Sequence, residues 1–141
     1  MKKIFTCFLL ALALCLMAGA QTKRPPLPSN LTKYVDEYPV ELMKVRAMKT
    51  RLRALLGKKY STFDEYLTVQ SPMTQVGDFL LASGCLPHSC TISESAFAID
   101  LKNKRIHAVI YDKDEKPKFY NEDKAETPDV LLNWVKERTG M

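Results

Sequence analysis

Apolar residues in the first half of the chain recur at steps of three and four, the spacing of one face of an α-helix. The clearest stretch carries basic residues on its other side and ends at Gly57, a residue type that often terminates helices. Its apolar positions are Leu42, Val45, Met48, Leu52, Leu55 and Leu56. A second, shorter helix is expected to begin at a cap supplied by Ser61 or Thr62. Its apolar residues are Phe63, Tyr66 and Leu67.

From Gln75 onward the helical period gives way to the alternation expected of strands. Residues 77–83 form a short apolar run, which predicts a buried strand. Residues 96–101 and 106–111 alternate in hydropathy on either side of the polar turn 102–104, a pattern typical of an antiparallel hairpin. Residues 116–120 are expected to add an edge strand, since Pro117 has no N–H to donate to a ladder.

The last predicted helix opens at Thr127-Pro128-Asp129 and stops at Gly140. Thr127 is expected to cap it, Pro128 suits the first turn, and Asp129 favours the positive end of the helix dipole. The apolar stripe is Val130, Leu131, Trp134 and Val135. Helices, then strands, then a helix predict an α+β fold, an antiparallel β-meander with N-terminal helices and a C-terminal helix packed on it.

Residues 1–20 have the form of a cleavable secretory signal peptide. Lys2 and Lys3 precede an apolar run over residues 4–17, and small residues follow at 18–20. The run is too short for a membrane span. A lipid anchor at Cys15 is disfavoured because the large Leu14 precedes it. The short leader with its two lysines is typical of bacterial export, so a periplasmic protein is expected.

Cleavage near Gln21 would leave a proline-rich, extended lead-in over residues 21–38 and one domain over residues 39–141. Losing Lys2 and Lys3 lowers the formal net charge from +5 to +3. This mild excess gives no indication of nucleic-acid binding, which calls for a clustered basic face. No later segment is apolar enough to span a membrane, and homodimer formation is left open.

Cys7 and Cys15 leave with the signal, so the mature chain keeps Cys85 and Cys90. An even pair of cysteines in an exported chain predicts a disulfide. So short a loop contributes on the order of 2 kcal/mol by loop-closure entropy, and its sharper effect is local. Pro87 stiffens the ring further, so His88 has little freedom to lose on binding. We therefore expect a rigid knob suited to the cleft of another protein.

An imidazole can donate from one nitrogen and accept at the other, which suits a cleft lined by carboxylates. Glycosidases have such a pair of carboxylates. The run Cys85-Leu86-Pro87-His88-Ser89-Cys90 resembles the Cys-Lys-Pro-His-Asp-Cys loop of the inhibitor of vertebrate lysozyme (Ivy) family, with the likeness extending from Pro39 to the C-terminus. The resemblance implies a non-enzymatic periplasmic inhibitor that inserts His88 into the active site of a chicken-type (C-type) lysozyme or related glycan hydrolase.

Two loop residues depart from that family's pattern, since Leu86 replaces a lysine and Ser89 an aspartate. Leu86 offers an apolar contact in place of a charge, and Ser89 can still hydrogen-bond within the ring. The alternative function is a non-inhibitory envelope protein of the same fold, which would use the loop to bind or scaffold another partner.

The residues of the loop are also compatible with other roles. The cysteines could be a structural staple alone, or a redox pair, although four intervening residues do not match thioredoxin-like spacing. Cys85, His88 and Cys90 could ligate zinc or copper, but no fourth ligand is evident and exported thiols oxidise. We therefore expect no metal and no cofactor.

The remaining polar residues indicate no catalytic site. His107 is expected to be a half-buried or surface strand residue, and the basic cluster of residues 46–53 a solvated helix face. Glu94 and Asp100 flank a strand with nothing linking them to His88. Ser89 and Ser93 lie near His88 without a third, orienting group, as a nucleophile site requires.

Overall fold

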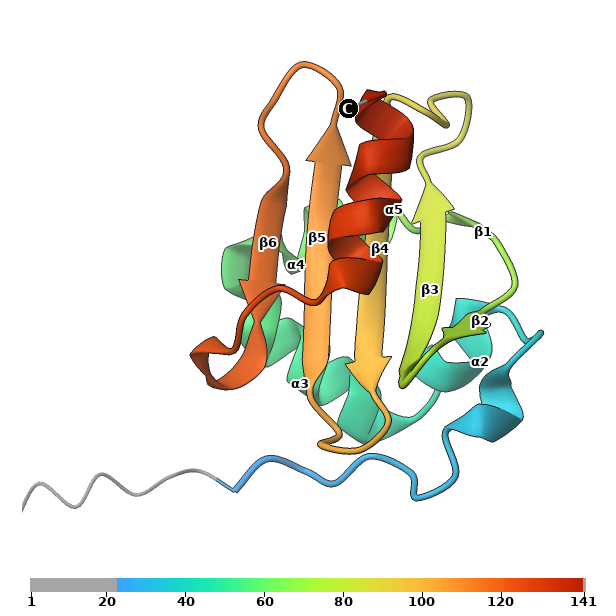
Figure 1. Cartoon of the computed structure of the whole chain (residues 1–141), viewed down its shortest axis with the longest axis vertical. Coiled ribbons are helices and arrows are strands. Elements are labelled where there is room, and N and C mark those ends of the chain that lie inside the picture. Colours follow the sequence, from blue (N-terminus) through green and yellow to red (C-terminus); the bar gives the residue numbers. More distant parts are fainter. Residues whose placement is uncertain (1–22, 141) are drawn as a thin grey trace, which may run out of the picture.

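A computed structural model describes residues 23–140, in which one antiparallel sheet lies between N-terminal helices and a C-terminal helix (Figure 1). This arrangement confirms the predicted α+β fold. The predicted signal peptide lies outside the described residues. Within those residues, no helix has the length and apolarity needed to cross a membrane.

The sheet has six strands in the order β1-β3-β4-β5-β6, with β2 also paired to β3. Consecutive pairing from β3 to β6 confirms the predicted meander. The short strands β1 and β2 are not predicted by the sequence pattern, because their residues are largely exposed and lack an apolar alternation. The strands are β1 (Val69–Gln70), β2 (Thr74–Val76), β3 (Phe79–Cys85), β4 (Ser93–Asp100), β5 (Ile106–Asp112) and β6 (Lys118–Asn121).

The N-terminal helical layer is more segmented than its periodicity predicts. Val45 is extended, with φ −71° and ψ 114°, and separates the expected single helix into two. The next helix follows a 3₁₀ turn directly and begins one residue before Ser61, without a side-chain cap. The segments are η2 (Thr32–Tyr34), α2 (Pro39–Met43), α3 (Arg46–Leu56), η3 (Gly57–Lys59) and α4 (Tyr60–Glu65).

The C-terminal helix α5 (Asp129–Thr139) follows η4 (Glu122–Lys124) and covers the opposite face of the sheet (Figure 1). Gly140 ends α5 in the left-handed region, with φ 67°, as predicted. The predicted cap is wrong, because Thr127 does not cap the helix and Pro128 occupies the N-cap position. The Thr127 hydroxyl instead accepts a hydrogen bond from Asn121 Nδ2 at 2.9 Å.

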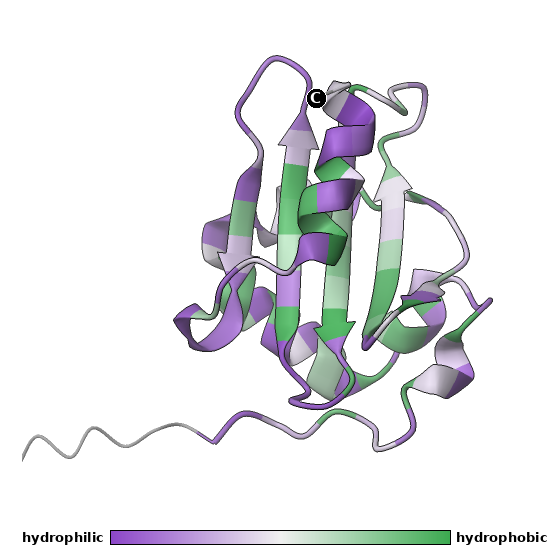
Figure 2. Ribbon diagram, viewed as in Figure 1, coloured by the Kyte–Doolittle hydropathy of each residue, from purple (hydrophilic) through white to green (hydrophobic). Residues whose placement is uncertain are grey.

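Alternating residues of β4 and β5 supply two cores, because successive strand side chains point to opposite faces. Phe97, Ile99 and Ile106 pack with the N-terminal helices. Ala96 and Val109 pack with the apolar stripe of α5. Figure 2 shows hydrophobic residues along both central strands, whereas α5 is largely polar on the side turned away from the sheet.

The described part of the lead-in, residues 23–38, is docked on the domain. Residues 23–31 form no helix or strand, but Leu27 and Leu31 are buried in the larger core. Arg24 donates to both carboxylate oxygens of Asp123 at 2.7 Å. Apolar burial and this ion pair hold the segment along the base of the domain (Figure 1).

Two polar residues are more buried than sequence analysis expects. Arg51, assigned to a solvated face, is 5 % exposed because it pairs with Glu122. His107 is 3 % exposed on the α5 side of the sheet. Its Nδ1 lies 2.8 Å from Asn121 Oδ1, and Phe79 packs edge-on against its ring. Both side chains have interior partners that no local sequence pattern indicates.

Candidate inhibitory loop

The predicted disulfide is present and closes the connection between β3 and β4 at one end of the sheet (Figure 1). Cys85 is the last residue of β3 and is buried, whereas Cys90 is exposed. Their Cα atoms are 5.0 Å apart. Since Cys85 pairs with Val69 on one side and Glu94 on the other, one half of the ring is fixed within the sheet.

Close packing beneath the ring explains the glycine that precedes Cys85. A Cβ atom on Gly84 would lie 2.7 Å from the backbone oxygen of Val69 and 3.1 Å from the Cα of Leu67. Both contacts are with backbone, which cannot rotate away. A glycine here therefore lets β1 and the preceding turn approach β3 and support the start of the loop.

The tip of the ring is a hydrogen-bonded turn. The Ser89 N–H donates to the Leu86 carbonyl at 3.0 Å. Pro87 occupies the second position of this turn, and His88 the third, with φ 62°. Proline followed by a left-handed residue is the pattern of a type II turn. Pro87 and His88 are exposed, so the turn presents the imidazole at the protein surface.

Backbone hydrogen bonds hold the rest of the loop. Leu86 donates to the Ser93 carbonyl at 2.9 Å, and the Ser89 carbonyl accepts from Ile92 at 3.0 Å and from Ser93 at 2.9 Å. The Lys113 N–H donates to the Ile92 carbonyl at 2.9 Å, which ties the loop to the connection between β5 and β6. Ser89 thus acts within the ring through its backbone, and Leu86 is half-buried.

The limb of the loop that leaves the ring, residues 91–92, is supported by a pair of side chains that the sequence does not indicate. Glu94 accepts a hydrogen bond from the Thr91 N–H at 3.0 Å and from Arg138 Nε at 2.7 Å. Glu94, predicted to flank a strand, lies within β4, and no local signal in the sequence links it to a residue of the last helix. A hollow of about 560 Å³ beside the ring is lined in part by Cys90, Thr91, Glu94 and Arg138.

The disulfide and the position of Ser93 affect whether the loop could bind a metal ion or supply a nucleophile. Both sulfurs are consumed in the disulfide, so no thiolate is left for zinc or copper. Among residues 23–140, no group of three His, Cys, Asp or Glu side chains is arranged to hold a metal ion. Ser93 is buried, and its hydroxyl donates to Asp112 Oδ2 at 3.5 Å. The structure does not bring Ser93 to His88 as a nucleophile and base.

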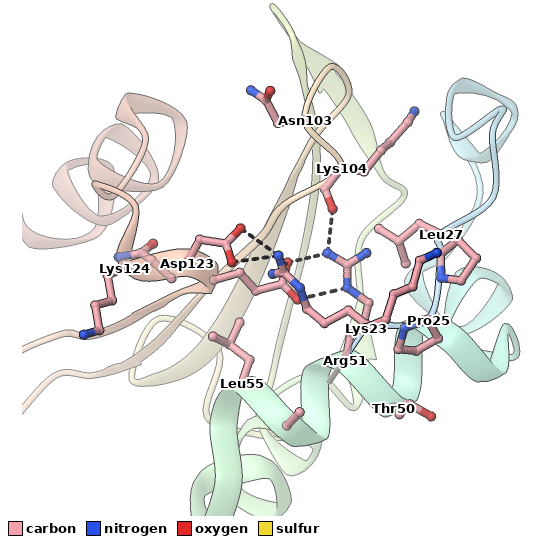
Figure 3. A pocket seen from close by; sticks show the side chains of 15 residues that line it. Lys23, Pro25, Leu27, Thr50, Arg51, Leu55, Asn103, Lys104, Asp123 and Lys124 are labelled. Atoms are coloured by element: carbon pink, nitrogen blue, oxygen red, sulfur yellow. Dashed lines mark hydrogen bonds and ion pairs between the residues drawn. The ribbon is translucent and has the colours of Figure 1, made fainter. Parts of the chain in front are cut away.

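A larger hollow, of about 1290 Å³, lies at the opposite end of β4, between the lead-in, α3 and η4. Figure 3 shows Arg51 in a network of interactions there. Arg51 donates to Glu122 Oε1 at 2.9 Å and to the Lys104 carbonyl at 2.6 Å. Glu122 also accepts from the Ile106 N–H at 2.8 Å and pairs with Arg24 at 3.1 Å. These polar groups satisfy one another, which indicates a structural role.

Asp123 extends the network at the protein surface. Hydrogen bonds from Arg24 lower the pKa of the Asp123 carboxyl below its usual range, and Arg105 acts in the same direction. Arg105 Nε lies 3.2 Å from Asp123 Oδ2. Ionised Asp123 thus joins the lead-in to the end of the sheet.

The chain matches a known protein family over residues 47–140, a range that contains the whole disulfide loop and α5. The matching family model is described as inhibitor of vertebrate lysozyme (Ivy). No curated protein and no solved structure gives a significant match. Members of this family are periplasmic, non-enzymatic inhibitors of lysozyme. Because the match covers well over half of the sequence, the chain belongs to the inhibitor of vertebrate lysozyme family.

Proposed function

We propose that this protein inhibits a lysozyme of the chicken type in the bacterial periplasm by presenting His88 to the catalytic carboxylates. The observation that carries the proposal is an exposed histidine at the tip of a disulfide-closed turn, in a member of a lysozyme-inhibitor family. A signal peptide over residues 1–20 would deliver the chain to that compartment.

The chemistry of the imidazole fits such a target. A glycosidase keeps one catalytic carboxyl protonated and the other ionised. A neutral imidazole accepts from the first and donates to the second, and a protonated imidazole donates to both. His88 between them would occupy the position of the scissile glycosidic bond, so the substrate would be excluded without any bond being made or broken.

The backbone of the loop favours tight binding because its order is established before the partner arrives. Pro87 and the disulfide restrict the turn, and the Ser89 and Leu86 backbone groups close it. Free energy that a flexible loop would lose in becoming ordered is thereby retained as affinity.

The two departures from the family's loop define how this inhibitor would differ. Leu86 and Ser89 carry no charge, so the knob relies on its shape and on His88 for recognition. Leu86 is half-buried and would offer part of its side chain to an apolar wall of the target. These differences favour a distinct range of lysozymes.

The test is His88→Ala, with purified mature protein titrated into a chicken-type lysozyme assay. Removing a central binding residue should weaken inhibition by about 30-fold or more, in line with interface hot spots. The thermal midpoint should stay unchanged, since His88 is exposed. Lys102→Ala, at the exposed turn beyond the other end of β4, is the matched control and should inhibit like the native protein. Full inhibition by the His88→Ala variant would exclude His88 as the residue that blocks the active site.

A second candidate function is a non-inhibitory envelope protein that uses the loop to bind another partner. The apolar Leu86, in place of a charged family residue, favours it. One lysozyme activity assay distinguishes the two functions. If the alternative is correct, an excess of mature protein leaves lysozymes fully active.

A further inference from the structure

The limb of the loop that leaves the ring contains a strained residue. Thr91 has φ 75°, in the left-handed region that β-branched side chains rarely adopt. Its N–H donates to Glu94 Oε1 at 3.0 Å, and Glu94 itself is buried. The neighbouring residues Cys90 and Ile92 are exposed. The hydrogen bond to Glu94 is therefore a link between this exposed limb and the interior.

Glu94 is in turn held by the last helix. Arg138 Nε donates to Glu94 Oε2 at 2.7 Å, and Arg138 Nη1 donates to the Trp134 carbonyl at 2.8 Å. The guanidinium lies over the Trp134 ring, 3.6 Å from its centre. The Arg138 side chain is 21 % exposed and that of Glu94 is 8 % exposed. A mostly shielded charge pair fixed at both ends holds its geometry better than a surface pair does.

The disulfide alone does not determine where the ring points. It closes residues 85–90 on themselves, with Cys85 anchored in β3 and Cys90 exposed. Leu86 and Ser89 form backbone hydrogen bonds with Ile92 and Ser93, so the direction of the ring relative to the sheet depends in part on the limb that follows Cys90. That limb is the one in which Thr91 is strained, and strained residues persist where surrounding contacts over-determine them.

We propose that Glu94 and Arg138 are positioning residues, which orient the disulfide ring and thereby set His88 for insertion into the target. This inference rests on the proposed inhibitory function, and it assigns α5 a part in binding. Neither side chain needs to touch the partner. Their effect would be to remove motion that the ring would otherwise lose on binding.

The first test compares Glu94→Ala with Glu94→Gln. Alanine removes the acceptor of the Thr91 N–H and the partner of Arg138, so we expect about a tenfold loss of inhibition, equivalent to roughly 1.4 kcal/mol. Glutamine keeps an oxygen that can accept from Thr91, so it should recover part of that loss. Amide hydrogen exchange at Thr91 should accelerate in the alanine variant and stay closer to native in the glutamine variant.

Arg138→Ala provides a second route if Glu94→Ala does not fold, since Arg138 lies nearer the surface. Its control is Arg24→Ala, which also removes an arginine from a carboxylate pair, but at the other end of the sheet. Arg138→Ala should weaken inhibition by several-fold to about tenfold, whereas Arg24→Ala should leave it native. Inhibition is measured well below the thermal midpoint of each variant, so that differences in folded fraction do not enter.

A folded Glu94→Ala or Arg138→Ala protein that inhibits as strongly as the native protein would overturn the proposal. Failure of the native protein to inhibit any lysozyme would refute the proposed function instead. In that case Thr91 exchange still decides whether Glu94 and Arg138 order the ring, because exchange requires no partner. Native exchange rates in both variants would then overturn the positioning role as well.

Discussion

Strand β4 has a polar cluster near each of its ends, and the two clusters differ in what they hold. Beyond its last residue, Asp100, the buried Arg51–Glu122 pair secures α3 and η4 to the sheet. Beside its first residue, Ser93, the pair of Glu94 and Arg138 supports a loop whose tip is exposed. One cluster joins parts of the core, and the other joins the core to a protruding turn.

Both ends also contain non-glycine residues in the left-handed region. His88 and Thr91 lie at the loop end, and Lys104, Asp123 and Lys124 lie at the other. At the far end Asp123 accepts hydrogen bonds from Arg24, and the adjacent Glu122 accepts one from the Ile106 N–H. At the loop end His88 is left exposed at the tip of the turn. The comparison indicates that backbone strain supports packing at one end and presentation of a side chain at the other.

Of the changes at the two ends of β4, removal of Glu122 should cause the largest loss of stability. Glu122→Ala leaves Arg51 buried without its carboxylate and Ile106 without its acceptor, and we expect a loss of about 3–5 kcal/mol in unfolding free energy. Urea unfolding measures it. Inhibition by the folded fraction should be native, because the loop lies at the other end of β4. A loss below about 1 kcal/mol, the range of exposed pairs, would contradict the structural role given to this cluster.

Removal of the disulfide should affect inhibition more than stability, the reverse of the effect expected for Glu122→Ala. Replacing Cys85 and Cys90 together with alanine should lower the unfolding free energy by about 2 kcal/mol, as expected for so short a closed loop. Inhibition should fall by about tenfold or more, because the ring would become ordered only on binding. Thermal unfolding and lysozyme titration are read on the same samples. If inhibition fell only in proportion to the folded fraction, the disulfide would be a structural staple.

The smallest expected effect concerns pH at the far end. The folded-state pKa of Asp123 is lowered, chiefly by hydrogen bonds from Arg24, so its ionised form stabilises the fold above the pKa of the unfolded chain. That contribution is lost as the pH falls below about 4 and through the folded-state value. Asp123→Asn should therefore lose less stability than the native protein between neutral and acidic pH. Asparagine also tolerates the left-handed backbone at this position.

Denaturant midpoints measured from neutral to acidic pH test this expectation. The difference between the two proteins should shrink at high salt, because Asp123 and Arg24 are both substantially exposed and their attraction is screened. Parallel pH profiles for the native protein and the Asp123→Asn variant at low salt would show that another carboxyl governs acid sensitivity.

Local patterns were a reliable guide where one periodicity dominated. The hairpin of β4 and β5, the stripe of α5 and the end of that helix at Gly140 all follow from residue spacing and backbone preference. Local patterns were less reliable where the same sequence pattern is compatible with two different local conformations. The break at Val45 interrupts an apolar period that reads as continuous, and Thr127 bonds to a neighbouring strand instead of capping a helix.

Residue spacing and composition predict the α+β order of elements, the Cys85–Cys90 disulfide and the position of His88 between the two cysteines. These depend on residues close together in the chain. Only in the folded protein does Glu94 contact Arg138 and Arg51 contact Glu122, and only there does the lead-in dock through Leu27. Each of these contacts joins distant segments, and a charged or apolar side chain carries no local sign of which distant partner will compensate its burial.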